Sequence, residues 1–312
     1  MSKGRSLAVV TLAYVAAIAV GAAWLWVGPH AGLPGGGSEA TRGRAPWLDT
    51  LIADLLATLV IFVFSRAYRN SSFYDAYWSV IPPLLLGYWW WAGPIAASGP
   101  GALRCWLMSA VMLYWAVRLT GNWVYGFPGL HHEDWRYPLL RDGAGRFGLL
   151  ADLFGIHLFP TLQVFVGLLP VYVAATRPGD GLVWLAWLAF AVGIAAVTLE
   201  LAADVQMHRF VAARKAGTET ATVMDRGLWA WSRHPNYFGE VSFWFSLALF
   251  GISASPRDAW WLFVGVVVML AMFLGASIPL MEKRSLERRP HYQDVIDRVP
   301  MLLPRPARKA AR

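Results

Sequence analysis

Charged residues, cysteines and nucleotide-binding glycine motifs are scarce or absent in this sequence. Only 15% of its 312 residues are Asp, Glu, Lys or Arg, against roughly 25% in a typical soluble domain. A hydrophobic content of 57% accompanies this deficit. The two figures exclude an ordinary soluble protein and indicate that the chain folds mainly in a lipid bilayer.

The remaining absences limit the chemistry. The single cysteine, Cys105, lies in an apolar stretch, which excludes an intrachain disulfide and argues against a cysteine-based metal site. No strand–Gly-x-Gly-x-x-Gly–helix unit occurs, so a soluble dinucleotide fold is excluded and any nucleotide must bind among helices. The net charge of +8 does not indicate a nucleic-acid partner, because the basic residues lie between hydrophobic runs.

Eight stretches are apolar enough to cross a bilayer, which takes about 20 helical residues. They are 7–27, 48–64, 77–97, 102–119, 149–175, 182–203, 237–253 and 259–281. With the N-terminus in the cytosol, this count places 22 of the 27 lysines and arginines on the cytosolic side, as the positive-inside rule requires. If the second stretch is partly interfacial, seven spans remain.

The sequence therefore predicts an all-α, polytopic membrane bundle of seven or eight transmembrane helices, with both termini cytosolic and with cytosolic loops closing over a cofactor site. We divide it into an N-terminal transmembrane hairpin at 1–70 and a membrane domain at 71–312. Residues 28–47, rich in glycine, are expected to form a flexible linker. The Ala-, Arg-, Gly- and Trp-rich composition suggests a bacterial inner membrane.

Ionisable residues cluster near the end of the sixth span. Glu200, Asp204 and His208 are four residues apart, which places them on one helical face, and Arg209 follows. Ionisable groups at membrane depth are costly and usually face a partner or a wet cavity. We interpret the face either as a structural salt-bridge surface or as a wall for a polar cofactor.

The segment 227–240, GLWAWSRHPNYFGE, combines basic and flat side chains. Arg226, Arg233 and His234 supply positive charge or hydrogen-bond donors, and Trp229 supplies a flat face. A basic loop that leads into a helix N-terminus favours diphosphate binding. The alternative is an interfacial loop that contacts lipid headgroups.

The helix after this loop is expected to begin at Pro235, which suits a first helical position. Asn236 and Glu240 then lie one turn apart, where an amide and a carboxylate can bind ribose hydroxyls or a carboxamide. After the last span, Glu282 precedes a basic run in which arginine forks suit a phosphate group. That run contains Lys283, Arg284, Arg288 and Arg289.

A second polar cluster occupies residues 129–142, GLHHEDWRYPLLRD. The adjacent histidines at 131 and 132 cannot easily face one ion, so we expect no metal. We expect a cytosolic lid over the cofactor, with Glu133, Arg136 and Tyr137 as contacts. His157, in the middle of the fifth span, either has a functional role or forms a hydrogen bond between two helices.

The segments ELAADVQMHRF, GLWAWSRHPNYFGE and IPLMEKRSLERRPHYQDV resemble the membrane reductases related to steroid 5α-reductase, and more closely their bacterial DUF1295 branch. The resemblance covers about 75–304 and is strongest over 200–292. It implies a helical membrane fold that binds NADPH between cytosolic loops and the last helices. It places Asp204, Asn236 and Glu240 on cofactor-binding positions, with Tyr237 in the same stretch and Glu282 near the exit.

The resemblance also implies a reaction, in which hydride moves from NADPH to a C=C bond conjugated to a carbonyl while a donor polarises that carbonyl. The implied substrate is a lipophilic enone of steroid, sterol, isoprenoid or fatty-acyl type, taken from the bilayer lipids. The chain departs from the steroid enzymes here, because Trp115 stands where they have a tyrosine. The candidate proton donors are Asp75, Tyr114 and Tyr137.

Two other readings stay open. The membrane isoprenylcysteine and phospholipid methyltransferases share an RHP-x-Y-x-G stretch and bind S-adenosylmethionine, which carries no phosphate. The extra arginines and lysines of this chain favour the reductase. A non-enzymatic role, as a partner subunit or a lipid-binding protein, would require the site carboxylates to be purely structural.

Overall fold

The computed structural model describes residues 1–27, 46–178 and 181–307, so most of the predicted linker at 28–47 lies outside the described residues. The described residues are helical and contain no strand, which confirms the all-α prediction. They divide into two compact units, 1–95 with 115–176 and 96–114 with 177–312. The proposed division at residue 70 stays a prediction.

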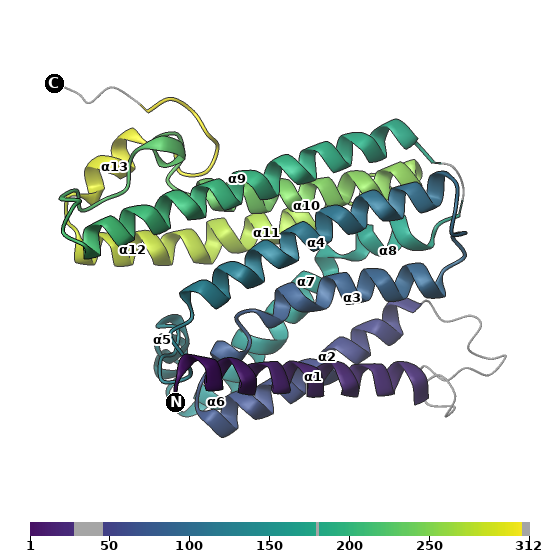
Figure 1. Cartoon of the computed structure of the whole chain (residues 1–312), viewed down its shortest axis with the longest axis horizontal. Coiled ribbons are helices and arrows are strands. Elements are labelled where there is room, and N and C mark those ends of the chain that lie inside the picture. Colours follow the sequence, from purple (N-terminus) through teal and green to yellow (C-terminus); the bar gives the residue numbers. More distant parts are fainter. Residues whose placement is uncertain (28–45, 179–180, 308–312) are drawn as a thin grey trace. The chain divides into compact units, whose positions relative to one another are not determined.

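The first unit contains the N-terminal helices and the second half of α4 (Figure 1). Helices α1 and α2 pack along each other. A 3₁₀ turn and α3 follow, and after α4 the chain forms a short α5 and a segmented helix. Its elements are α1 (Lys3–Val27), α2 (Pro46–Tyr68), η3 (Ser71–Phe73), α3 (Tyr77–Ala92), α4 (Pro100–Gly126), α5 (Arg136–Gly143), η4 (Gly145–Phe147), α6 (Gly148–Leu150), η5 (Ala151–Leu158), α7 (Phe159–Gly167) and α8 (Leu169–Thr176).

The second unit is built on the 33-residue helix α9 (Val183–Lys215), which packs along α10 (Pro235–Ala254). Gly239 permits this packing, because a Cβ there would collide with Cγ of Glu200 and lie 3.0 Å from the Ala196 carbonyl oxygen. The other elements are η6 (Gly227–Ala230), η7 (Pro256–Asp258), α11 (Val264–Met272), η8 (Phe273–Ser277), α12 (Ile278–Arg288) and α13 (Tyr292–Arg298).

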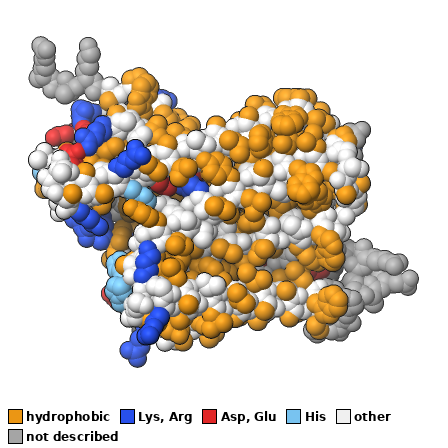
Figure 2. Space-filling model, viewed as in Figure 1, with side chains coloured by type: hydrophobic (Ala, Val, Ile, Leu, Met, Phe, Trp, Pro, Cys, Tyr) orange, Lys and Arg blue, Asp and Glu red, His pale blue; other side chains and the backbone are white. Residues whose placement is uncertain are grey.

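Seven helices of the described residues are long and apolar enough to cross a membrane, which makes the chain a multi-pass membrane protein. They are Lys3–Val27, Pro46–Tyr68, Pro100–Gly126, Gly145–Gly167, Val183–Lys215, Pro235–Ala254 and Val264–Arg288. The difference from eight lies in α3, whose 16 residues contain Pro82 and Pro83. The second stretch, which was the alternative reason for seven spans, forms the 23-residue helix α2. Figure 2 shows hydrophobic side chains over most of the face in view.

Two predicted spans are irregular. The stretch 149–175 is divided into a π-helix (Ala151–Leu158), α7 and α8. A second π-helix (Phe273–Ser277) joins α11 to α12, so this helical run continues to Arg288. Single π-helical turns within α-helices often mark functional sites.

Candidate functional site

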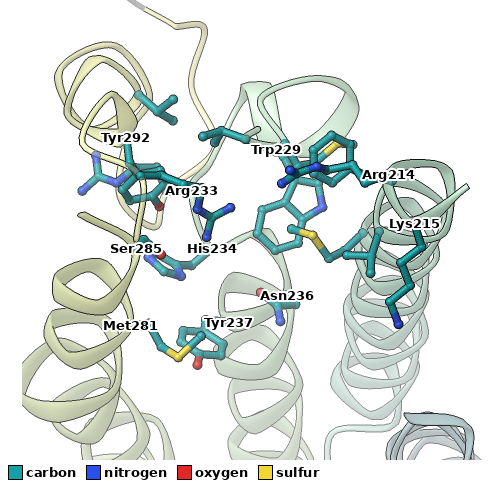
Figure 3. Close-up of a pocket in the computed structure, with 17 residues that line it drawn as sticks. Arg214, Lys215, Trp229, Arg233, His234, Asn236, Tyr237, Met281, Ser285 and Tyr292 are labelled. Atoms are coloured by element: carbon teal, nitrogen blue, oxygen red, sulfur yellow. The ribbon is translucent and has the colours of Figure 1, made fainter. Parts of the chain in front are cut away.

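A pocket of about 660 Å³ lies in the second unit. Figure 3 shows its side chains between α9, the start of α10 and α12. The volume is typical of small-molecule sites. The pocket is lined by Met207, Phe210, Val211, Arg214, Lys215, Val223, Met224, Trp229, Arg233, His234, Asn236, Tyr237, Met281, Ser285, Arg289, Tyr292 and Val295.

The η6 turn forms one wall and is held on α9 by two hydrogen bonds. The Leu228 N–H donates to Gln206 Oε1 over 2.9 Å, and Trp229 Nε1 donates to the Ala203 carbonyl over 3.1 Å. Gly227 makes this docking possible, because its φ of +61° favours glycine and a Cβ would lie 2.5 Å from Gln206 Oε1. The local turn therefore fixes the indole of Trp229 against the pocket.

The next residues, 231–233, are anchored to the C-terminal segment. Ser232 Oγ donates to the Leu302 carbonyl over 2.9 Å, and the Arg233 N–H donates to the Pro300 carbonyl over 2.8 Å. Helix α10 begins directly after them, with Pro235 in its first turn, which confirms the predicted start. The C-terminal segment thereby fixes where α10 enters the pocket wall.

Glu282 joins the two basic residues of the RHPNY stretch. Its Oε1 accepts from Arg233 Nε at 2.7 Å and lies 3.0 Å from His234 Nε2. Arg233 Nη1 also donates to the carbonyls of Ile296 and Val299, over 2.9 and 2.6 Å. The guanidinium thus binds α12 and the end of α13 at the same time.

Three rings form a stack beside the pocket. The His234 and Tyr237 ring centroids are 5.3 Å apart at 14°, and those of Tyr237 and Phe273 are 4.4 Å apart at 6°. Phe273 opens the second π-helix. The stack holds Tyr237 flat, and Figure 3 shows it beside Asn236 at the base of the pocket.

Asn236 lines the pocket and carries a buried acceptor. Its Oδ1 is buried and has no hydrogen-bond partner among the described residues. A buried acceptor without a partner costs about 1–3 kcal/mol. A ligand that donates a hydrogen bond to Asn236 would remove this cost, which would favour binding.

Five of the twelve predicted cofactor contacts line this pocket: Trp229, Arg233, His234, Asn236 and Tyr237. Seven do not: Glu200, Asp204, Arg209, Arg226, Glu240, Glu282 and Arg284. Arg214 and Lys215 also line the pocket, although the sequence did not single them out among the basic residues of the cytosolic side. Their place at the end of α9, one to two turns beyond His208, was the signal that would have found them.

The seven other residues have different surroundings. Glu200 is buried against Gly239, and Glu240 Oε1 accepts from Trp244 Nε1 over 2.9 Å. Arg226 is paired with Glu219 and lies 5.7 Å from the ring centroid of Phe210. Arg209 is exposed, Glu282 orients Arg233 and His234, and Asp204 and Arg284 make contacts of their own.

Two of the three candidate proton donors meet in the first unit. The Tyr137 hydroxyl donates to the Asp75 carboxylate in a short hydrogen bond. Burial raises the pKa of Asp75 to about 6, although the Tyr137 hydrogen bond and Arg136 oppose the rise. Burial, followed by the Asp75 charge, raises the pKa of Tyr137 well above its ordinary value. Asp75 therefore titrates within reach of neutral pH.

The segment 129–142 folds onto the turn at 70–75 of the same unit. Asn70 Nδ2 donates to the carbonyls of Leu130 and His132, over 2.9 and 3.0 Å. Glu133 accepts from the Ser71 N–H over 2.7 Å and from Arg141. The contacts expected of a lid thus bind within the first unit, and the lid role stays a prediction.

The π-helix of the first unit carries a fully buried carboxylate, Asp152. It accepts from Arg66 Nη1 over 2.9 Å and from Ser71 Oγ over 2.6 Å. His157 lies about one turn later on the same π-helix, with Nδ1 2.9 Å from the Asp152 carbonyl oxygen and Nε2 3.0 Å from Ser65 Oγ. The structure thus supports the helix–helix hydrogen bond for His157. Among the described residues, no group of three or more His, Cys, Asp or Glu side chains is placed to hold a metal ion.

Tyr114 belongs to the second unit, and its hydroxyl lies 3.3 Å from Thr198 Oγ1. Thr198 lines a shallow, open groove of about 590 Å³ along α9, and the groove lining also includes Leu228, which precedes the pocket residue Trp229 in the chain. The groove is almost wholly apolar, and its lining comprises Phe190, Ala191, Ile194, Ala195, Thr198, Leu199, Ala202 and Leu228.

The sequence comparisons identify the family. Residues 61–299 match a family model described as Protein of unknown function (DUF1295). The chain belongs to the DUF1295 family. All residues that line the pocket of this DUF1295 protein lie within the matched range, so the resemblance over 200–292 is confirmed at the level of the family.

One curated relative is an uncharacterized protein of Schizosaccharomyces pombe, C594.04c, which is 27% identical over 280 residues. The similarity covers 83% of this chain and 80% of the yeast protein. No solved structure matches the chain at a significant level.

Proposed function

We propose that this DUF1295 protein is an NADPH-dependent membrane reductase that reduces the C=C bond of a lipophilic enone. The observation that carries the proposal is the buried, unpartnered Oδ1 of Asn236 in a pocket that also contains cationic and aromatic side chains. Such a pocket suits a polar ligand with flat rings, hydrogen-bond donors and negative charge. A nicotinamide dinucleotide phosphate combines all three.

The pocket residues fit such a dinucleotide. Arg214, Lys215 and Arg289 supply positive charge at the rim, where phosphates bind favourably. Trp229 and Tyr237 supply flat faces for rings. The Asn236 acceptor suits a carboxamide N–H or a ribose hydroxyl. The volume of about 660 Å³ is of the right order for the ligand.

Bound NADPH would supply the hydride, and the chain must supply the proton and stabilise the enolate charge. Within the first unit, the Tyr137–Asp75 pair is one candidate proton donor, because a carboxyl with a pKa of about 6 is partly protonated near neutrality. Tyr114 is the other hydroxyl candidate, hydrogen-bonded to Thr198 at the apolar groove. We propose both and let mutation separate them.

The groove along α9 supports the proposed substrate class. Its lining is apolar, and α9 is one of the helices suited to span the membrane. A hydrocarbon ligand from the bilayer, such as a steroid, sterol, isoprenoid or fatty-acyl chain, matches that lining. We propose that the pocket faces the cytosol, because the positive-inside rule assigns the basic segments of α9, α12 and the C-terminus to that side. The Ala-, Arg-, Gly- and Trp-rich composition supports a bacterial inner membrane as the location.

The test is a binding experiment on purified full-length protein in detergent. Trp229 lines the pocket, so tryptophan quenching can follow titrations with NADPH and with S-adenosylmethionine. We expect saturable NADPH binding that weakens about tenfold in Asn236→Ala, which removes the acceptor, and less in the isosteric Asn236→Asp. Binding of S-adenosylmethionine without NADPH would replace the reductase by a methyltransferase, and binding of neither would favour a non-enzymatic role.

Reduction itself is tested with membranes and a panel of lipophilic enones, by NADPH oxidation and product analysis. Tyr114→Phe and Tyr137→Phe each remove one hydroxyl and keep the ring. The variant that loses kcat by at least 100-fold while it still binds NADPH identifies the donor. Full activity in both variants would exclude both tyrosines.

A further inference from the structure

The basic residues around the pocket fall into two groups that differ in their partners. Arg233 has a side chain that is only 8% exposed and is bound by Glu282 at 2.7 Å. Its Nη1 is also bound by two backbone carbonyls of the α13 end. His234 shares the same carboxylate. The charge of the RHPNY stretch is therefore balanced within the protein.

Arg214 and Arg289 form the second group. Nη1 of Arg214 donates to the Thr222 carbonyl oxygen over 3.3 Å, and Nη1 of Arg289 donates to the same oxygen over 3.0 Å. Lys215 lines the pocket next to Arg214. Among the described residues, none of these three cations lies within ion-pair distance of a carboxylate.

This arrangement leaves excess positive charge at one corner of the pocket. Two guanidinium groups bound to one oxygen lie close together and repel each other, while a single carbonyl supplies only a partial negative charge. The carbonyl fixes their separation before a ligand arrives. A doubly charged anion between them would relieve the repulsion and accept from both forks.

We propose that Arg214 and Arg289 form the phosphate subsite that selects NADPH over NADH, and that Arg233 is a positioning residue. This inference rests on the proposed dinucleotide function. The selecting group is the 2′-phosphate, because a phosphate monoester carries close to two negative charges near pH 7. Each phosphate of the diphosphate bridge carries only one negative charge, so it balances the charge of two guanidinium groups less well than the 2′-phosphate does.

The experiment compares NADPH and NADH binding by tryptophan quenching. The wild-type protein is expected to bind NADPH at least tenfold more tightly than NADH. Arg214→Gln and Arg289→Gln are each expected to weaken NADPH binding about 10- to 100-fold, the size of a charge-assisted hydrogen bond, with NADH binding little changed. The double variant is expected to bind the two dinucleotides equally.

Two matched variants separate selection from structure. Arg288→Gln removes an exposed arginine that neighbours Arg289 but does not line the pocket, and it is expected to keep the NADPH preference. Arg233→Lys keeps the charge but not the fork, so both dinucleotides are expected to weaken together. An unchanged NADPH:NADH ratio in the double variant, or a ratio that falls in Arg233→Lys, overturns the assignment.

Adenosine 2′,5′-bisphosphate distinguishes failure of this inference from failure of the proposed function. Binding to the wild type but not to the double variant supports the subsite even if neither dinucleotide binds, in which case the reductase proposal alone falls. Equal binding of NADPH and NADH to the wild type overturns the subsite and leaves the reductase intact. If neither dinucleotide nor the bisphosphate binds, both proposals fall.

Discussion

Asn236 and Glu240, one helical turn apart, illustrate how differently two polar residues on one face are used. Asn236 Oδ1 is buried at the pocket without a partner among the described residues, whereas Glu240 accepts from the Trp244 indole. The sequence assigned both to the cofactor. The structure leaves only Asn236 with an unused acceptor, because Glu240 lies one turn deeper among the packed helices.

At the same scale, Gly227→Ala tests the wall that carries Trp229. Gly227 has a φ of +61°, and an added Cβ would lie 2.5 Å from Gln206 Oε1, so the substitution combines backbone strain with a collision. We expect a loss of about 2–4 kcal/mol of stability and at least tenfold weaker NADPH binding. Thermal unfolding and quenching titrations measure the two effects.

The control for this prediction is Gly217→Ala. Gly217 also has a positive φ, +73°, but a Cβ there meets nothing within 4 Å. Strain alone, about 1 kcal/mol, is expected, with NADPH binding kept. Equal losses of NADPH binding in the two variants would show that the Gln206 contact does not position Trp229.

For Asp75, the raised pKa predicts how the stability of the protein depends on pH. Burial raises the pKa of Asp75 to about 6, well above that of an ordinary aspartate, so near pH 5 the folded state holds a proton that the unfolded chain has released. The contribution of Asp75 to stability is therefore fully present below about pH 4 and is lost as the pH rises through 6, by on the order of 3 kcal/mol. We expect the Tm of the wild type to fall by roughly 5–10 °C relative to Asp75→Asn between pH 4 and 7.

Tyr137→Phe sharpens that measurement. The Tyr137 hydroxyl lowers the pKa of Asp75 by donating to its carboxylate, so its removal is expected to move the fall in Tm to higher pH. A Tm difference between the wild type and Asp75→Asn that stays constant over this range would show that Asp75 does not titrate there.

Among the elements, the packed pair of helices α9 and α10 supplies part of the pocket lining. The two helices pack closely at Gly239, where the Glu200 side chain fills the space of a missing Cβ. Glycine within a helix normally costs about 1 kcal/mol relative to alanine. Its presence here is explained by close helix packing, which is a common use of small residues between membrane helices.

Gly239→Ala is expected to separate the helices at this point. The overpacked alanine should lower stability by about 1–3 kcal/mol and widen the base of the pocket, so both Tm and NADPH affinity fall. Gly275→Ala is the matched control, because a Cβ at Gly275 meets nothing within 4 Å. A Tm for Gly239→Ala equal to that of Gly275→Ala would contradict close packing as the reason for the glycine.

For the whole molecule, the number of membrane crossings depends on whether α3 crosses the membrane. Seven crossings would place the two termini on opposite sides of the membrane, and eight would place them on the same side. At 1.5 Å per residue, the 16 residues of α3 span about 24 Å, less than the roughly 30 Å of a hydrocarbon core. The positive-inside distribution nevertheless favours eight crossings.

We therefore expect α3 to cross the membrane. The test uses a Cys105→Ser background, since Cys105 is the one cysteine of the chain and is buried. Arg69→Cys and Ser98→Cys place exposed thiols before and after α3. An impermeant thiol reagent applied to intact cells should label position 98 and not position 69. Labelling of neither or both would mean that α3 does not cross.

The sequence alone determined that this protein folds in a lipid bilayer and that its fold is all-α. The charge deficit and the long apolar runs that show this are properties of the sequence and do not depend on tertiary contacts. The sequence also located the start of α10 at Pro235, since proline suits a first helical turn regardless of tertiary context. Five of the twelve candidate cofactor contacts line the pocket, and most of these five lie on one short segment with a defined helical start.

Only the tertiary structure decided which arginines at the pocket are already bound by a carboxylate of the protein and which can bind an anionic ligand. Arg233 stands out in the sequence but is bound by Glu282, 49 residues away, whereas Arg214 and Arg289 lie 75 residues apart in the chain and meet at one carbonyl. The short length of α3 and the π-helical breaks likewise depend on packing. Charge balance and helix irregularity arise from contacts between distant segments, which local residue patterns do not encode.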